Sequence, residues 1–160
     1  MIDQYHFYHG AALREICANS IKPVAIEYIN KKLDQDSHNF NTYIVNNKVG
    51  VYIKHSTSRA KTWTFSFVKE HQDTILDLYK IYGNVVVLLI CHDDGIVGLN
   101  FEELKEILDD NHEEIESIRI KRRKRELYKV SGTDGKLKYK VAHNDFLKKI
   151  LGEDNIKTNM

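Results

Sequence analysis

The chain of 160 residues is long enough to bury a hydrophobic core and short enough to form one domain. Its 42% hydrophobic and 29% charged residues are typical of a globular protein. The longest apolar run, Val85–Cys91, is far shorter than the roughly 20 residues that span a bilayer. The N-terminal MIDQYHFYHG lacks the apolar segment of a signal peptide, so we expect a cytoplasmic protein without a membrane partner.

The net charge of +1 hides two blocks of opposite sign. Residues 101–116 carry eight acids against one lysine, a net charge of −7, and residues 119–140 carry ten bases against two acids, a net charge of +8. Blocks of this kind create a local field even when the total charge is near zero. A polyanion is therefore a possible partner for the second block.

In the first third of the chain, residues 11–19 have the spacing of a helix, with Leu13, Ile16 and Cys17 on one face. Residues 24–29 fit either a short strand or a helical turn, and residues 31–41 are polar and indicate a loop. Cys17 and Cys91 both lie in apolar segments without CxxC spacing, which favours two reduced, buried thiols.

The middle of the chain predicts three strands, 42–46, 49–56 and 62–67, with a tight turn at Asn46-Asn47. A helix over 68–82 follows, with Gly83 as its C-cap. Residues 85–91 are continuously apolar and predict a strand buried on both faces, which Asp93-Asp94-Gly95 turns back into a strand over 96–99.

The last third begins with Asn100, which we expect to cap a helix that ends near residue 108, because Glu103 completes a capping-box pattern. A meander of three strands, 117–122, 127–131 and 137–141, and a helix over 144–151 are expected to follow. The whole chain then forms a single α/β (α+β) domain with a mixed central sheet flanked by helices.

This order of elements, and three stretches of text, resemble the PD-(D/E)XK nuclease superfamily over residues 8–108. The stretches are VGVYIKHSTS (49–58), SRAKTWTFSF (58–67) and VVVLLICHDDGIVGLNFEEL (85–104). The resemblance implies a restriction-endonuclease-like core over residues 1–108, followed by a basic, β-rich addition over 109–160. In such nucleases, two carboxylates on adjacent strands bind Mg²⁺, and a nearby lysine stabilises developing charge.

Carried over to this chain, the resemblance makes Lys54 the motif lysine and Glu15 the match for a glutamate on the first helix. Tyr52 stands where the second acid belongs, and neither Thr42 nor Tyr43 supplies the first. The catalytic motif is therefore degenerate, and we expect no metal or other cofactor. An active enzyme would need Mg²⁺ and acids from elsewhere in the chain, such as Glu27, Asp34 or Asp36.

Other catalytic signatures are missing from the sequence. The histidines show no metal-ligand spacing, which favours surface or structural roles, and the chain has no GxxxxGK[ST], GxGxxG or GxSxG motif. The strongest charge run is Lys121 to Arg125. It has three open interpretations: a solvated strand edge, a partner for the acidic block, or a site for the phosphate backbone. The predicted nucleic-acid-binding residues are Arg59, Lys61, Lys121, Arg122, Arg123, Lys124 and Arg125.

The leading hypothesis is a DNA- or RNA-associated protein with a degenerate, inactive nuclease-like core. The resemblance implies a restriction, defence or mobile-element system as its setting. Two alternatives remain open: an active metal-dependent nuclease with displaced ligands, and a protein-interaction module or inhibitor subunit of a protein complex.

Overall fold

The computed structural model describes residues 1–29, 41–111 and 115–158. The predicted loop over 31–41 therefore lies almost wholly outside the described residues, as do Asp34 and Asp36. In chain order, the elements are α1 (Gln4–Asn19), β1 (Ile26–Ile29), β2 (Thr42–Val45), β3 (Val49–Ser56), β4 (Thr62–Phe67), α2 (Lys69–Tyr82), β5 (Val85–Cys91), β6 (Gly95–Asn100), α3 (Phe101–Ile107), β7 (Glu116–Lys121), β8 (Lys129–Gly132), β9 (Gly135–Lys136), α4 (Asp145–Leu151) and the short 3₁₀ helix η1 (Glu153–Asn155).

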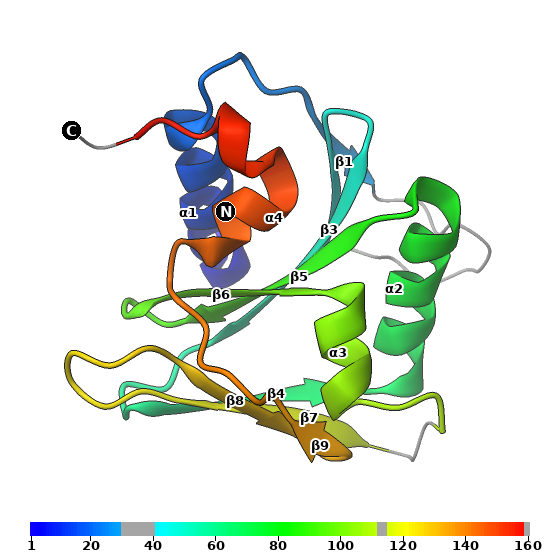
Figure 1. Ribbon diagram of the computed structural model, residues 1–160, viewed down its shortest axis with the longest axis vertical. Helices are drawn as coiled ribbons and strands as arrows, with labels where there is room; N and C mark the ends of the chain where they lie inside the picture. The colour runs from blue at the N-terminus through cyan, green and yellow to red at the C-terminus, as the bar shows by residue number, and fades with distance from the viewer. Residues whose placement is uncertain (30–40, 112–114, 159–160) are drawn as a thin grey trace.

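The first sheet is mixed, with the strand order β1-β2-β3-β5-β6. β3 and β5 pair in parallel and the other neighbours pair antiparallel. Every residue of β5 is buried, as expected for a central strand covered on both faces. The mixed sheet flanked by helices confirms the predicted fold class (Figure 1).

The second sheet is antiparallel, with the order β4-β7-β8-β9. Its first strand, β4, does not extend the sheet of the two strands before it but pairs with β7, from the last third of the chain. The inward side chains Trp63, Phe65 and Phe67 are buried, while Thr64 and Ser66 are exposed. That alternation is typical of a sheet with one face on the core and one face in water.

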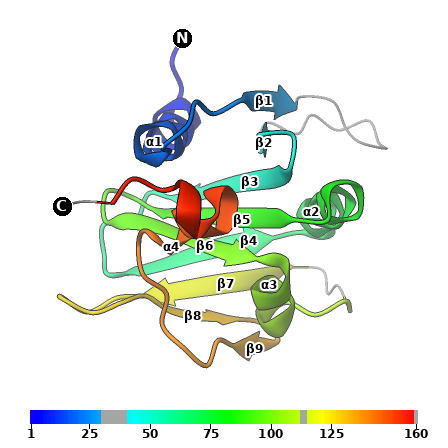
Figure 2. The same cartoon turned by 45° about the horizontal axis from the view of Figure 1, so that its top comes forward.

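Two hydrophobic clusters lie on the two faces of the first sheet. α1 and α4 cover one face, and α2 and α3 lie with the inner face of the second sheet on the other (Figures 1 and 2). α4 approaches β6 closely, because a Cβ at Gly98 would lie 2.4 Å from the Cβ of Phe146. Among the described residues, no helix is long and apolar enough to cross a membrane.

The helix ends follow local signals. Gly83 ends α2 in the left-handed conformation, with φ of 72°, and the Asn100 side chain accepts a hydrogen bond from the Glu103 backbone N–H, so both predicted caps are confirmed. α1 begins at Gln4, well before the predicted start at residue 11. Its first half packs through Tyr8 and His9, rings that an aliphatic pattern does not reveal.

Several other predictions differ from the structure. Residues 26–29 form a strand, which resolves one open choice. The strand expected over 137–141 is wrong: beyond the Leu137 N–H bond to the Val130 carbonyl oxygen, this segment forms a single bridge, Tyr128 with Val141. Leu137 and Val141 are buried and the three residues between them are exposed, so burial does not alternate as it does in a strand. Cys17 is exposed rather than buried, since Ile16 takes the inward position on that turn of α1.

Candidate nucleic-acid interface

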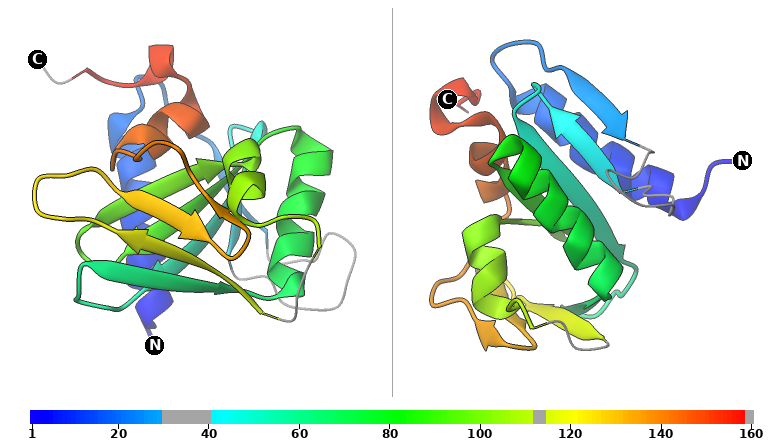
Figure 3. Two further views of the ribbon diagram at one scale, coloured as in Figure 1. Left: turned by 60° about the horizontal axis from the view of Figure 1, so that its bottom comes forward. Right: turned by 90° about the vertical axis from the view of Figure 1, so that its right-hand side faces the viewer.

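The outer face of the second sheet is basic. The alternation of β7 directs Ile118 and Ile120 into the core and leaves Arg119 and Lys121 exposed. β8 adds the exposed Lys129, and β9 adds Lys136. Figure 3, left, looks onto this face.

Lys121 and Lys129 are directly opposite each other on β7 and β8. Both side chains are exposed. Like charges at directly opposed positions of a sheet repel each other and destabilise the pairing. The fold therefore places two like charges opposite each other at the last pair of the β7–β8 ladder, next to the turn.

A groove with a volume of about 590 Å³ adjoins this lysine pair. We call it the basic groove. Six cations and one carboxylate line it: Lys121, Arg123, Lys129, Lys136, Lys138 and Lys140, with Glu126. Lys140 lies 3.2 Å from Glu126, and the other five cations make no ion pair with any described residue. The groove thus carries a strong positive charge that the described residues do not neutralise.

Two of the predicted binding residues, Lys61 and Arg122, are ion-paired within the protein. Asp94, in the β5–β6 turn, accepts hydrogen bonds from Arg122 Nε and Nη2 at 2.7 and 2.6 Å, from Lys61 Nζ at 2.7 Å and from Tyr128 OH at 2.6 Å. Its side chain is 5% exposed. The Arg122 guanidinium, with Lys61 and Tyr128, holds the pKa of Asp94 well below its usual range. Arg122 and Lys61 therefore join loops of the two sheets through the shared carboxylate of Asp94.

The other predicted cations are exposed. Arg59 lies in the loop between β3 and β4, and Lys124 and Arg125 lie in the turn between β7 and β8. Lys121 and Arg123 belong to the basic groove. Through Lys61 and Arg122, Asp94 contacts both of these connecting segments.

Lys54, the expected motif lysine, points between the two sheets. Its Nζ donates to the Ser66 carbonyl oxygen and lies 3.2 Å from His71 Nδ1 and 4.7 Å from the centre of the Phe67 ring. Burial lowers the pKa of Lys54 to about 8. Its contacts join β3 to β4 and α2, and no carboxylate is among its recorded partners within the described residues.

The positions expected for the metal-binding acids do not fit Mg²⁺. Thr42 and Tyr52 are direct cross-strand neighbours, 1% and 2% exposed. Burial raises the pKa of Tyr52 to about 12, so its phenol stays neutral. The Thr42 hydroxyl has no hydrogen-bond partner among the described residues. Mg²⁺ needs charged oxygen ligands, which neither side chain supplies.

Glu15 does not join Lys54. Beside it on α1, Ile16 packs on the face of β3 that holds Val51 and Ile53, whereas Lys54 projects from the opposite face. The Glu15 carboxylate instead contacts Arg14 and Asn19, each at 3.1 Å. Glu27 is exposed on β1, at the outer edge of the first sheet.

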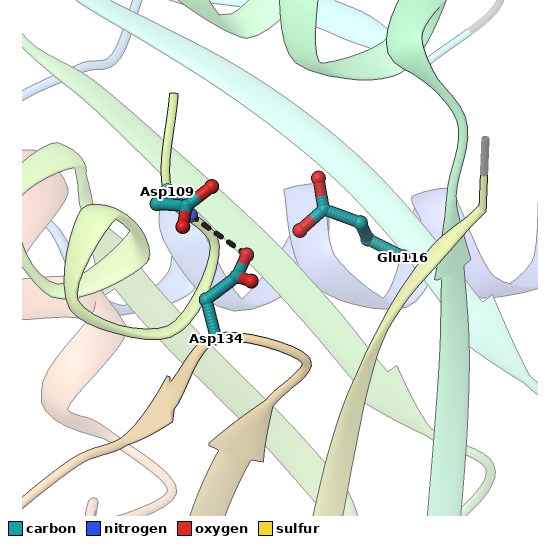
Figure 4. Close-up of side chains that lie close together, drawn as sticks. All are labelled: Asp109, Glu116 and Asp134. Atoms are coloured by element: carbon teal, nitrogen blue, oxygen red, sulfur yellow. Dashed lines mark hydrogen bonds between the residues drawn. The ribbon is translucent and has the colours of Figure 1, made fainter. Parts of the chain in front are cut away.

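Three carboxylates meet elsewhere, at Asp109, Glu116 and Asp134, with oxygens within 4.8 Å of one another (Figure 4). The Asp109 backbone N–H donates to Asp134 Oδ2 at 3.0 Å. Hydrogen bonding with Glu116, and then with Asp109, lowers the pKa of Asp134. Carboxylate oxygens grouped in this way suit a divalent cation. A proton shared between two of the carboxyl groups would equally stabilise the cluster, with no cation bound.

A cluster of histidine and tyrosine rings docks α1 on the first sheet. Tyr8 OH lies 2.7 Å from His92 Nδ1, and the Tyr8 ring stacks on His55 with centroids 4.4 Å apart. His9 Nδ1 lies 2.9 Å from Tyr43 OH. His9 is 3% exposed, and its Nε2 has no hydrogen-bond partner among the described residues. These contacts give the histidines the structural role that their spacing favours.

The groove cations beyond residue 125 are absent from the predicted binding set. Their signal in the sequence is the basic block over 119–140, which includes Lys129, Lys136, Lys138 and Lys140. The sequence predicts binding by Lys121 to Arg125 because these five charges are consecutive. The structure instead gathers charges that are spread over three strands, the β7–β8 turn and the segment after β9.

Comparisons of the chain with protein-family models, with curated proteins and with solved structures found no match.

Proposed function

We propose that this protein binds nucleic acid through the phosphate backbone, with the basic groove of its second sheet as the contact surface. The observation that carries the proposal is the direct opposition of Lys121 and Lys129 beside the other groove cations. A bound polyanion relieves the repulsion between these lysines, and the release of its counterions favours binding.

The two other interpretations of the basic block explain less. Lysines protect the edge strands of a sheet from pairing, but β7 is an interior strand with β4 and β8 on its two sides. Within the described residues, the acidic block pairs through Asp110 with Lys105 and through Glu103 with Lys149. None of the groove cations takes part in those pairs.

The test combines binding with stability. Replacing Lys121 by Glu converts a repulsive cross-strand pair into an attractive one, so the free energy of unfolding should rise by about 0.5 kcal/mol. The same change removes a phosphate contact, so affinity for a labelled oligonucleotide should fall. The slope of log K against log salt should become less steep by about 1 to 2, since the new carboxylate also repels phosphate.

Lys48→Glu is the matched control, because Lys48 is an exposed lysine in the β2–β3 turn of the first sheet. It should leave both affinity and salt slope nearly unchanged. Equal losses for the two variants would show that only net charge matters and would remove the groove from the proposal. If no DNA or RNA binds even at low ionic strength, the proposal is wrong and the result favours the protein-interaction module.

We also propose that the nuclease-like core does not cleave. Its first sheet has the antiparallel opening strands, the crossover helix α2 and the central strand β5 that the resemblance implies, which supports the likeness. The neutral, buried Thr42 and Tyr52 beside Lys54 support the loss of the metal site. Incubation of the protein with DNA and RNA in Mg²⁺ should yield no product. Cleavage that Lys54→Ala abolishes would favour the active-nuclease alternative.

A further inference from the structure

One aromatic side chain lies among the groove cations. Tyr139 is 54% exposed, lines the basic groove and is flanked in the chain by Lys138 and Lys140, both of which also line it. Leu127, 49% exposed, lines the same groove. The hollow therefore combines positive charge with exposed apolar surface.

The Tyr139 ring is anchored at its hydroxyl. Tyr139 OH donates to Glu103 Oε2 at 2.6 Å, and Glu103 is only 4% exposed. Lys149 Nζ, at 2.8 Å, and the Asn100 backbone N–H, at 3.0 Å, hold the other oxygen of Glu103. The hydrogen bond to Glu103 raises the pKa of Tyr139, so the phenol remains a neutral donor. A fixed ring with exposed surface loses little freedom when a ligand stacks on it.

Aromatic rings beside a cationic track are the arrangement by which proteins hold unpaired strands. The cations follow the phosphates, and a base stacks on the ring, which is possible for any base because each has a π-face. In a duplex the bases stack on one another and their faces are not available. Contacts with phosphates alone, as on a duplex, require only the cations, whereas base stacking also requires an exposed aromatic ring such as Tyr139.

We propose that the basic groove selects single-stranded nucleic acid, with one base stacked on Tyr139. This inference rests on the proposed function, because it names the form of nucleic acid that the same groove takes. Phosphates contact Lys121, Lys129 and the lysines on either side of Tyr139. DNA and RNA share this chemistry, so the experiment includes both.

The probes are fluorescein-labelled oligo-dT, oligo-U and a blunt DNA duplex with the same number of phosphates, each titrated by anisotropy at low and at moderate salt. Oligo-dT and oligo-U should both bind more tightly than the duplex. Tyr139→Ala should weaken single-strand binding by about 10-fold or more and leave the salt slope unchanged, because stacking releases no counterions. Duplex affinity should not change.

One variant separates the stacking of the ring from its anchoring, and a second is a control. Tyr139→Phe keeps the ring and loses the hydrogen bond to Glu103, so it should retain most of the single-strand affinity. Tyr28→Ala is the control, because Tyr28 is a similarly exposed tyrosine, 49%, on β1 of the first sheet. A probe with 5-iodouracil should photo-crosslink to Tyr139 in the wild-type protein, which reports the contact without any variant.

Several results would overturn the inference while the proposed function stands. They are duplex binding as tight as single-strand binding, a Tyr139→Ala variant with unchanged single-strand affinity, or a crosslink elsewhere than the groove. A Tyr139→Phe variant as weak as Tyr139→Ala would assign the effect to the Glu103 anchor instead of the ring. Failure of all three probes to bind at low salt would overturn both proposals together.

Discussion

Acidification should loosen α1 from the first sheet through His9. Burial, with smaller repulsion from His55 and His6, lowers the pKa of His9 from 6.5 to about 4. Between these two values the unfolded chain binds a proton that the folded chain does not. The stabilising contribution of neutral His9 is therefore complete above about pH 6.5 and is lost progressively as the pH falls towards about 4.

The size of the effect follows from the same two values. Between about pH 7 and about pH 5, the linkage relation gives a loss of about 2 kcal/mol in the free energy of unfolding. Burial also lowers the pKa of His55 and of His71, so both add to the loss in the same direction. Urea unfolding, followed by the fluorescence of the buried Trp63 at a series of pH values, measures the total.

His9→Gln isolates the share of His9, because glutamine can still hydrogen-bond to Tyr43 and does not titrate. The stability of this variant should fall by about 2 kcal/mol less than that of the wild type over the same pH interval. His6→Gln, on the exposed side of α1, removes only the smaller repulsion that His6 exerts on His9, so it should change the pH dependence far less than His9→Gln does. A His9→Gln curve parallel to the wild type would refute the reasoning.

Two further predictions concern the contacts that hold the sheets and helices together. Asp94→Asn leaves Arg122 and Lys61 without their shared carboxylate and should lower the free energy of unfolding in urea by about 2–4 kcal/mol. The control Asp93→Asn, at an exposed position, should change it by less than about 0.5 kcal/mol. Equal effects at the two positions would contradict the role of Asp94. Gly98→Ala places a methyl group against Phe146 and should cost about 1–3 kcal/mol, measured by thermal unfolding. The control Gly10→Ala should be neutral or stabilising, because a Cβ there would have no atom within 4 Å. A Gly98→Ala variant as stable as the wild type would show that α4 lies farther from β6 than the structure has it.

The sequence predicts most elements of the fold because their signals are local. The unbroken apolar run of β5, the stripe of α2 and the Asn100 cap each depend on neighbours within a few residues. The partner of β4 is a different matter. Alternation shows that one face of β4 is buried, but nothing in residues 62–67 indicates pairing with a strand about fifty residues later.

The candidate site is also only partly predictable from local sequence. A basic block is visible in the sequence, but which of its cations stay available depends on distant partners. Arg122 looks like its neighbours in the run, yet Asp94, 28 residues earlier, takes its guanidinium. Lys54 likewise matches a motif position, and its contacts with Ser66 and His71 arise only when β4 and α2 fold beside β3.

The pairing of β4 with β7 means that the two sheets cannot be separated by cutting the chain once. β4 lies in sequence between β3 and β5 of the first sheet, while its partner belongs to the segment expected as an addition after residue 108. A chain that stopped at residue 108 would expose the aromatic face of β4 and an unpaired edge, and should aggregate.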